Sequence, residues 1–307
     1  MASRSVRDYV LPTMRWTPGY SSDDVEDRRD EGPASAGIGA GGVGILFWLF
    51  SRFRLPGLLV GGAVLFFLSG GLGSGSESER PRSREPAGAM QGEDPDKQAK
   101  EFVSFVLDDV QKSWSERFAQ QGQRYPRSRL VLFNRSINSA CGLGQRAMGP
   151  FYCPGDQKVY IDLSFYKELR QRFGAPGDFA QAYVIAHEIG HHIQHLLGTD
   201  RQVQNAPRRA RQGEDSASVR LELQADCYAG MWAQSTQRRN LLEAGDIDEA
   251  LTAAAAIGDD RLQREATGTV QPETWTHGSS AERVRWFKRG YEAGTLEACD
   301  TFGSNRL

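Results

Sequence analysis

The 307-residue chain has few cysteines and almost no net charge. Its 37 Lys and Arg residues nearly balance 39 Asp and Glu residues, so a formal net charge of -2 gives no electrostatic reason to expect a nucleic-acid partner. Four cysteines without a CxxC pair argue against a zinc-finger type of structural site. With 39% hydrophobic and 25% charged residues, the composition excludes collagen-like, coiled-coil and wholly disordered classes.

The first 95 residues divide into three segments by composition. Residues 1–43 combine a charged cluster with many glycines and show no sustained apolar period, so we expect them to be disordered. Residues 44–73 are predicted to span a membrane once, because Leu55–Gly73 supplies 19 uncharged residues, or about 28 Å of helix. Residues 74–95 are rich in Ser, Glu, Arg, Pro and Gly, which is typical of a flexible linker.

The charges beside the apolar segment predict an orientation. Arg52 and Arg54 directly precede it, and charges of both signs follow it. The positive-inside bias therefore predicts a single-pass cell-membrane protein with a cytoplasmic N-terminus and an exported C-terminal part. Because Pro56 and several glycines weaken the pattern, a buried hydrophobic helix or a membrane-surface segment is the alternative.

Residues 96–303 are predicted to form an α+β domain that is mostly helical with a small sheet. Apolar residues at helical spacing between Phe102 and Trp114 indicate an amphipathic helix. Short Val- and Ile-rich runs at Leu130–Phe133 and Lys158–Leu163 indicate strands, and the second is expected to be an edge strand that could bind an extended peptide. Later helices are expected at about 163–173, 178–197, 216–238, 246–257 and 279–290.

The segment His187-Glu188-Ile-Gly-His191 carries the strongest chemical signal. Residues four apart on a helix are rotated by about 400°, so His187 and His191 project from one face. Two imidazoles placed in this way can bind one Zn²⁺, and Glu188 beside them can accept a proton from a metal-bound water. A metzincin would need Gly and His where this chain has Gln194 and Leu197, so that class is excluded.

Two more histidines follow, and a catalytic zinc requires a third protein ligand. We expect His192 to be a surface residue and His195 to be a packing residue. The predicted third ligand is Glu222, and Asp226 one helical turn later is placed to accept the free N–H of a ligating histidine. The alternative is that both acids lie on a solvated helix face.

His277 is the one histidine outside this cluster, and it precedes a helix that Ser279 and Glu282 can cap reciprocally. At a loop–helix junction it could stabilise the oxyanion of a tetrahedral intermediate. It could equally be an ordinary loop residue.

The cysteines are expected to form two disulfides if the domain is exported. Cys141 and Cys153 bracket a short loop and form the natural local pair, which leaves Cys227 with Cys299. The alternative is four buried free thiols in a cytosolic protein.

The chain resembles the bacterial neutral zinc metallopeptidase family over most of its length. The stretches that carry this resemblance include Met14–Trp16, Val25–Arg29, Gly149–Pro154, Val159–Ser164, Gly177–His187, Ile257–Gln263, Thr276–Ser280 and Trp286–Arg289. The resemblance implies a single membrane span and an exported zincin domain. It places the family's HExxH positions on His187, Glu188 and His191, and its gluzincin-like ExxAD segment on Glu222 and Asp226.

These features together predict a zinc-dependent endopeptidase that acts on a protein or peptide substrate. His187, His191 and Glu222 would hold Zn²⁺, Glu188 would act as general base, and His277 could assist as an oxyanion donor. A catalytically silent, membrane-tethered zinc-binding interaction module is the alternative, and a zinc hydrolase that acts on a non-peptide amide also fits the residues.

Overall fold

The structure is a computed structural model that describes residues 14–31, 94–145, 148–304 and 307. The predicted membrane segment 44–73 lies outside these residues, as does almost all of the predicted linker. Within the described ranges, no helix combines the length and the apolar character that crossing a bilayer requires.

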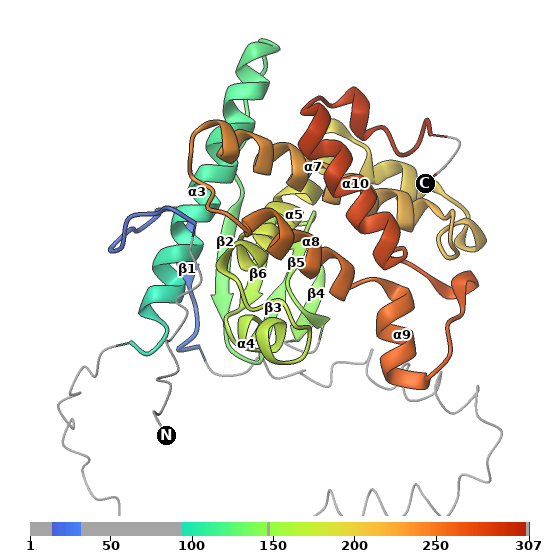
Figure 1. The fold of residues 1–307 in the computed structure, drawn as a ribbon, viewed down its shortest axis with the longest axis horizontal. Coiled ribbons are helices and arrows are strands. Elements are labelled where there is room, and N and C mark those ends of the chain that lie inside the picture. Colours follow the sequence, from blue (N-terminus) through green and yellow to red (C-terminus); the bar gives the residue numbers. More distant parts are fainter. Residues whose placement is uncertain (1–13, 32–93, 146–147, 305–306) are drawn as a thin grey trace, which may run out of the picture. The chain divides into compact units, whose positions relative to one another are not determined.

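A four-stranded sheet runs through the domain in the order β1-β2-β6-β5 (Figure 1). The strands are β1 (Val25–Asp27), β2 (Arg129–Phe133), β5 (Phe151–Cys153) and β6 (Lys158–Asp162). Strands β1, β2 and β6 run parallel to one another, and β5 is antiparallel to β6. A separate antiparallel hairpin is formed by β3 (Ser136–Ser139) and β4 (Gly142–Gln145).

Helices make up most of the described chain and confirm the predicted mixed, mainly helical class. They are α3 (Lys97–Gln120), α4 (Ser164–Gln171), α5 (Asp178–Leu197), α6 (Asp200–Asn205), α7 (Ala217–Arg238), α8 (Asp246–Ala256), α9 (Asp259–Thr267) and α10 (Ser280–Ala293). Short 3₁₀ turns lie at Arg208–Ala210, Pro272–Thr274 and Glu297–Cys299. The capping box of Ser279 and Glu282 at the start of α10 is present as predicted.

Both faces of the sheet are buried, which explains why β2 is almost entirely apolar. Leu130 and Leu132 belong to the main core, which also includes residues of α3 and α5. The alternate residues Val131 and Phe133 pack in a smaller cluster with Ile137 of the hairpin. Because side chains alternate along a strand, each face of β2 meets a different layer.

Both predicted strands are present, as β2 and β6, but the expectation that the second is an edge strand is wrong. β6 pairs with β2 on one side and with β5 on the other, so it is an interior strand and cannot accept a further strand. Among the described strands β5 forms that edge of the sheet instead. The short, aromatic sequence Phe-Tyr-Cys of β5 had given no strand signal, because three residues are too few to show alternation.

The N-terminal segment also differs from its prediction. Residues 14–31, expected to be disordered, include β1, and Met14 is only 1% exposed. Three residues of strand do not stand out in a charged, glycine-rich composition, and tertiary pairing with β2 decides their structure.

In the helix layer, α5 and α10 both pack closely against α7. A Cβ at Gly190 of α5 would lie 3.1 Å from the Cα of Ala225, and a Cβ at Gly230 of α7 would lie 2.0 Å from the carbonyl oxygen of Phe287 in α10. Small residues at these crossings therefore allow α5 and α10 to pack directly on α7 (Figure 1).

Both disulfides form with the pairing that the cysteine spacing suggested. Cys141 joins Cys153 over 12 residues, which ties the hairpin to β5. Cys227 joins Cys299 over 72 residues, which ties α7 to the segment after α10.

Candidate metal centre

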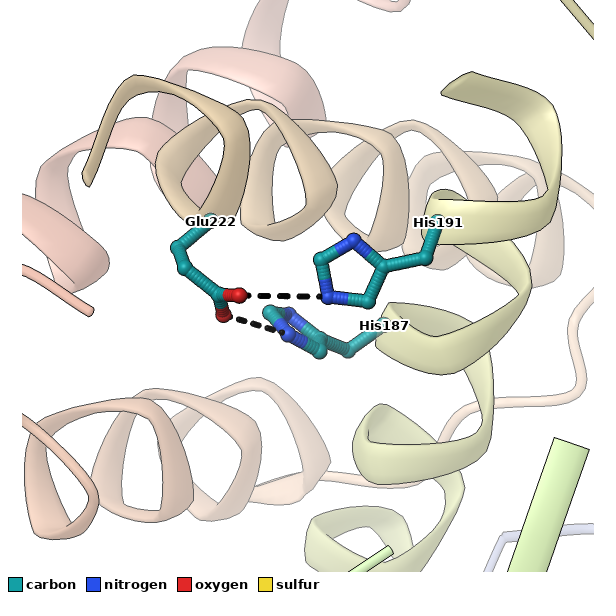
Figure 2. Close-up of side chains that lie close together, drawn as sticks. All are labelled: His187, His191 and Glu222. Carbon is teal, nitrogen blue, oxygen red and sulfur yellow. Dashed lines mark hydrogen bonds and ion pairs between the residues drawn. The ribbon is translucent and has the colours of Figure 1, made fainter. Parts of the chain in front are cut away.

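Helices α5 and α7 bring three potential metal ligands together. His187 and His191 lie one turn apart on α5, and Glu222 reaches toward both from α7 (Figure 2). Glu222 Oε2 lies 3.1 Å from His187 Nε2, and Glu222 Oε1 lies 3.4 Å from His191 Nε2. One ligand atom from each residue lies within 4.8 Å of the other two, a spacing that a single cation can bridge.

His187 has a carboxylate on each side of its ring. Its Nδ1 lies 2.9 Å from Asp226 Oδ1, while its Nε2 faces Glu222. Burial alone would lower the pKa of His187, but the charges and hydrogen bonds of Asp226 and Glu222 outweigh it and raise the pKa to about 10. A proton or a metal cation is therefore stabilised between His187 Nε2 and the Glu222 carboxylate.

Asp226 is fully buried and fixes the orientation of His187. It accepts hydrogen bonds from Arg283 Nε at 2.9 Å and Arg283 Nη2 at 3.0 Å, and from the hydroxyl of Tyr183. With these donors around it, Asp226 accepts the Nδ1 proton of His187, which leaves Nε2 as the ring nitrogen that faces Glu222 and that can exchange its proton for a metal ion. This arrangement suits a metal-ligating histidine.

His191 is held by a neutral partner in an equivalent way. The side-chain oxygen of Gln194 lies 2.8 Å from His191 Nδ1, and Gln194 Nε2 donates to the carbonyl of Leu221 at 2.6 Å. Gln194 is completely buried and also donates to Gln224 Oε1 at 3.1 Å. Because the Gln194 amide donates through Nε2, its oxygen accepts the Nδ1 proton and leaves the Nε2 of His191 free for a metal.

Glu188 lies in the same cavity, next to the ligands. Its side chain is only 7% exposed, and this burial raises the pKa of its carboxyl even though His191 and His187 act in the opposite direction. A raised pKa makes the Glu188 carboxylate a better proton acceptor than an ordinary glutamate, which suits a general base.

Glu222 has the opposite electrostatic character. Burial would raise its pKa, but His191 and His187 more than offset this and hold the pKa well below its usual value. Glu222 is therefore an anion in the folded protein, as a carboxylate ligand must be.

His277 lines the cavity that contains the three candidate ligands, and its side chain is half-exposed. Asp259 holds the loop around it, because one carboxylate oxygen accepts backbone N–H groups from Thr276, His277 and Gly278 at 2.6 to 3.1 Å. The other oxygen lies 3.2 Å from His277 Nδ1, and this hydrogen bond raises the pKa of His277. The Nε2 atom of His277 is then the nitrogen left for a substrate.

The prediction that His192 is a surface residue is wrong, whereas His195, predicted to be a packing residue, is part-buried with its ring centroid 6.3 Å from that of Tyr152. His192 is completely buried between the hydroxyl of Tyr152 at 3.0 Å and the carbonyl of Pro126 at 2.7 Å. Burial lowers the pKa of His192 to about 4, so the ring is neutral. His195 is partly exposed and pairs with Asp200 at 2.8 Å. The helix face toward the sheet, which sequence alone does not identify, decides which of the two is buried.

Sequence reasoning did not find Arg283, Tyr183, Gln194 or Asp259. Tyr183 precedes His187 by four residues and so shares its helix face, which is a usable signal. Arg283 lies 96 residues beyond His187, and no local pattern connects the two.

Two histidines of one helix and a glutamate of another define this chain as a protein with an HExxH-type candidate metal centre. Residues 14–302 match a family described as "Putative neutral zinc metallopeptidase", and the chain belongs to this family. Zinc is the metal that the family description implies, and the donor set of two imidazoles and one carboxylate fits it.

Relatives in two bacteria share most of the chain. The "Uncharacterized protein YpfJ" of Escherichia coli K12 is 44% identical over 300 residues, which cover 95% of this chain and 100% of the relative. The "Uncharacterized protein Rv2575" of Mycobacterium tuberculosis H37Rv is 46% identical over 194 residues, 60% of this chain and 65% of that protein. No solved structure matches the chain.

Proposed function

We propose that this protein is a zinc-dependent endopeptidase. The observation that carries the proposal is the convergence of His187, His191 and Glu222 beside the buried Glu188, in a cavity of 610 Å³. A cavity of this volume has room for several substrate side chains, because small-molecule sites typically occupy about 300–1,000 Å³.

His187, His191 and Glu222 would hold the metal. When bound, Zn²⁺ lowers the pKa of a coordinated water to about 7 and polarises the carbonyl that is attacked. Glu188 would take the proton from the attacking water and deliver it to the leaving amine, which its raised pKa favours. His277, held through Nδ1 by Asp259, would donate from Nε2 to the oxyanion.

We infer that β5 binds an extended substrate. β5 is an edge strand in the described sheet, and Phe151 and Tyr152 line the cavity with the candidate ligands. A peptide paired with β5 would use alternate amides for hydrogen bonds. In a series of substrate peptides that each carry one N-methylated amide, KM should therefore rise for methylation at every second position. The same rise in KM at all positions would contradict this binding mode.

The proposed function is tested by comparing the wild type with Glu188→Gln on denatured casein, with zinc content measured for both. The substitution removes the base but leaves the three candidate ligands, so zinc content should be equal while cleavage falls by 10²-fold or more, a typical contribution of general acid–base catalysis. Glu116→Gln on the exposed face of α3 is the matched control and should keep full activity.

Two results would reject the endopeptidase. Equal activity of the wild type and Glu188→Gln would remove Glu188 from the reaction. Zinc binding without cleavage by the wild type would favour the silent zinc-binding interaction module.

A further inference from the structure

Segments on either side of residues 32–93 form one continuous sheet. Val25, Glu26 and Asp27 of β1 pair in parallel with Leu130, Val131 and Leu132 of β2. The N–H of Leu130 donates to the carbonyl of Asp24 at 2.8 Å, and the N–H of Arg28 donates to the carbonyl of Leu132 at 2.9 Å. β2 then pairs with β6 over five residues, so β1 belongs to the sheet of the domain.

Side chains attach the same N-terminal segment to helix α3 and to strand β6. Tyr20 and Ser22 donate to the two carboxylate oxygens of Asp108 on α3, at 2.9 and 3.0 Å. Lys158 of β6 donates to both oxygens of Glu26 at 2.9 Å.

The start of the segment is just as firmly placed. Met14 is 1% exposed in the main core, and the N–H of Arg15 donates to the carbonyl of Leu241 at 2.8 Å. The ring of Trp16 packs edge-on against Phe102, with centroids 5.5 Å apart. Residues 14–31 therefore contact the sheet, α3 and the residues after α7.

Hydrogen bonds of this length cannot connect residues on opposite sides of a bilayer, whose hydrocarbon core is about 30 Å thick. Unpaired backbone groups of such a sheet would also be unsatisfied inside lipid. The two ends of residues 32–93 must then lie in the same aqueous compartment whenever the sheet is formed.

We propose that residues 14–31 and 94–304 lie on the same side of the membrane, so that the chain between them makes no net crossing. This topology replaces the single crossing, with its cytoplasmic N-terminus, that the arginine flank predicts. The proposal does not depend on peptidase activity.

Labelling of single cysteines in the full-length chain tests this topology. All four native cysteines are in disulfides, so an unreduced wild-type chain should give no background with a maleimide. Ser21→Cys reports on the N-terminal segment, and Arg209→Cys reports on the domain, both at exposed positions. Each is treated with a membrane-impermeant maleimide in intact spheroplasts and again after detergent lysis.

We expect Ser21→Cys and Arg209→Cys to give the same ratio of labelling before and after lysis, whether both are accessible or both are protected. Labelling of one in intact spheroplasts while the other requires lysis would overturn the proposal. Asp30→Cys and Gln121→Cys, also exposed, form a second pair that keeps the test valid if one variant fails to fold.

Discussion

Replacing Asp226 by Asn should weaken both the folded state and metal binding. Asp226 is fully buried, and its neighbours Arg283, Tyr183 and His187 all point donors at it. Asn has nearly the same shape but only one acceptor oxygen, and its NH₂ group would face donors. The substitution also leaves the guanidinium of Arg283, 1% exposed, without a buried counter-charge.

The magnitude follows from these contacts. Removing one partner of a buried ion pair typically costs about 3–5 kcal/mol of unfolding free energy. Loss of the acceptor for His187 Nδ1 should lower zinc affinity by about 10–100-fold, because the ring loses its fixed tautomer and orientation. We therefore expect both effects in Asp226→Asn, and the affinity change should persist at temperatures where the variant is fully folded.

Urea unfolding and a zinc-chelator competition separate the two effects. Asp109→Asn is the control, because Asp109 is also buried and accepts from Trp232 and Arg239 at 2.8 Å but contacts none of the candidate ligands. It should lose stability and keep its zinc affinity. An Asp226→Asn protein that binds zinc within twofold of the wild type would refute the role given to Asp226.

Two further predictions concern neighbouring groups. Gln194→Leu should lower zinc affinity by about 10-fold or more in chelator competition, because His191 Nδ1 loses its acceptor. It should also destabilise the metal-free protein by about 1–3 kcal/mol, because the carbonyl of Leu221 and Gln224 Oε1 lose a buried donor. Unchanged zinc affinity in the folded variant would contradict the role given to Gln194. Burial, together with repulsion from Asp178, raises the pKa of Glu249 to about 7, and burial, together with repulsion from Asp246, raises the pKa of Asp178 to about 6. The folded state therefore binds more protons than the unfolded state between about pH 4 and 7. The contribution of this pair to the unfolding free energy should fall as pH rises through that range. Glu249→Gln should therefore reduce the difference in unfolding free energy between pH 5 and pH 7.5, measured by urea unfolding at each pH. An unchanged difference would exclude Glu249 as its source.

The cap of α5 comes from another part of the chain. Gly177 occupies the N-cap position without a side-chain bond, and Asp178 is already the first residue of the helix. Glu249 of α8 instead accepts from the N–H of Phe179 at 3.1 Å. A cap supplied by another helix cannot be read from the residues around the helix start.

The sequence by itself determined the features that depend on short spacing. Helical periodicity placed α5 and α7 almost to the residue, and the i, i+4 relations of His187 with His191 and of Glu222 with Asp226 put each pair on one face.

Only the tertiary structure decided how distant segments meet. The close approach at Gly190 and Ala225 brings Glu222 to the histidines, and the packing of α10 on α7 brings Arg283 to Asp226. The inclusion of β1 in the sheet likewise depends on contacts across about a hundred residues of chain. Local spacing carries no information about such contacts, since they are selected by the free energy of packing the whole domain.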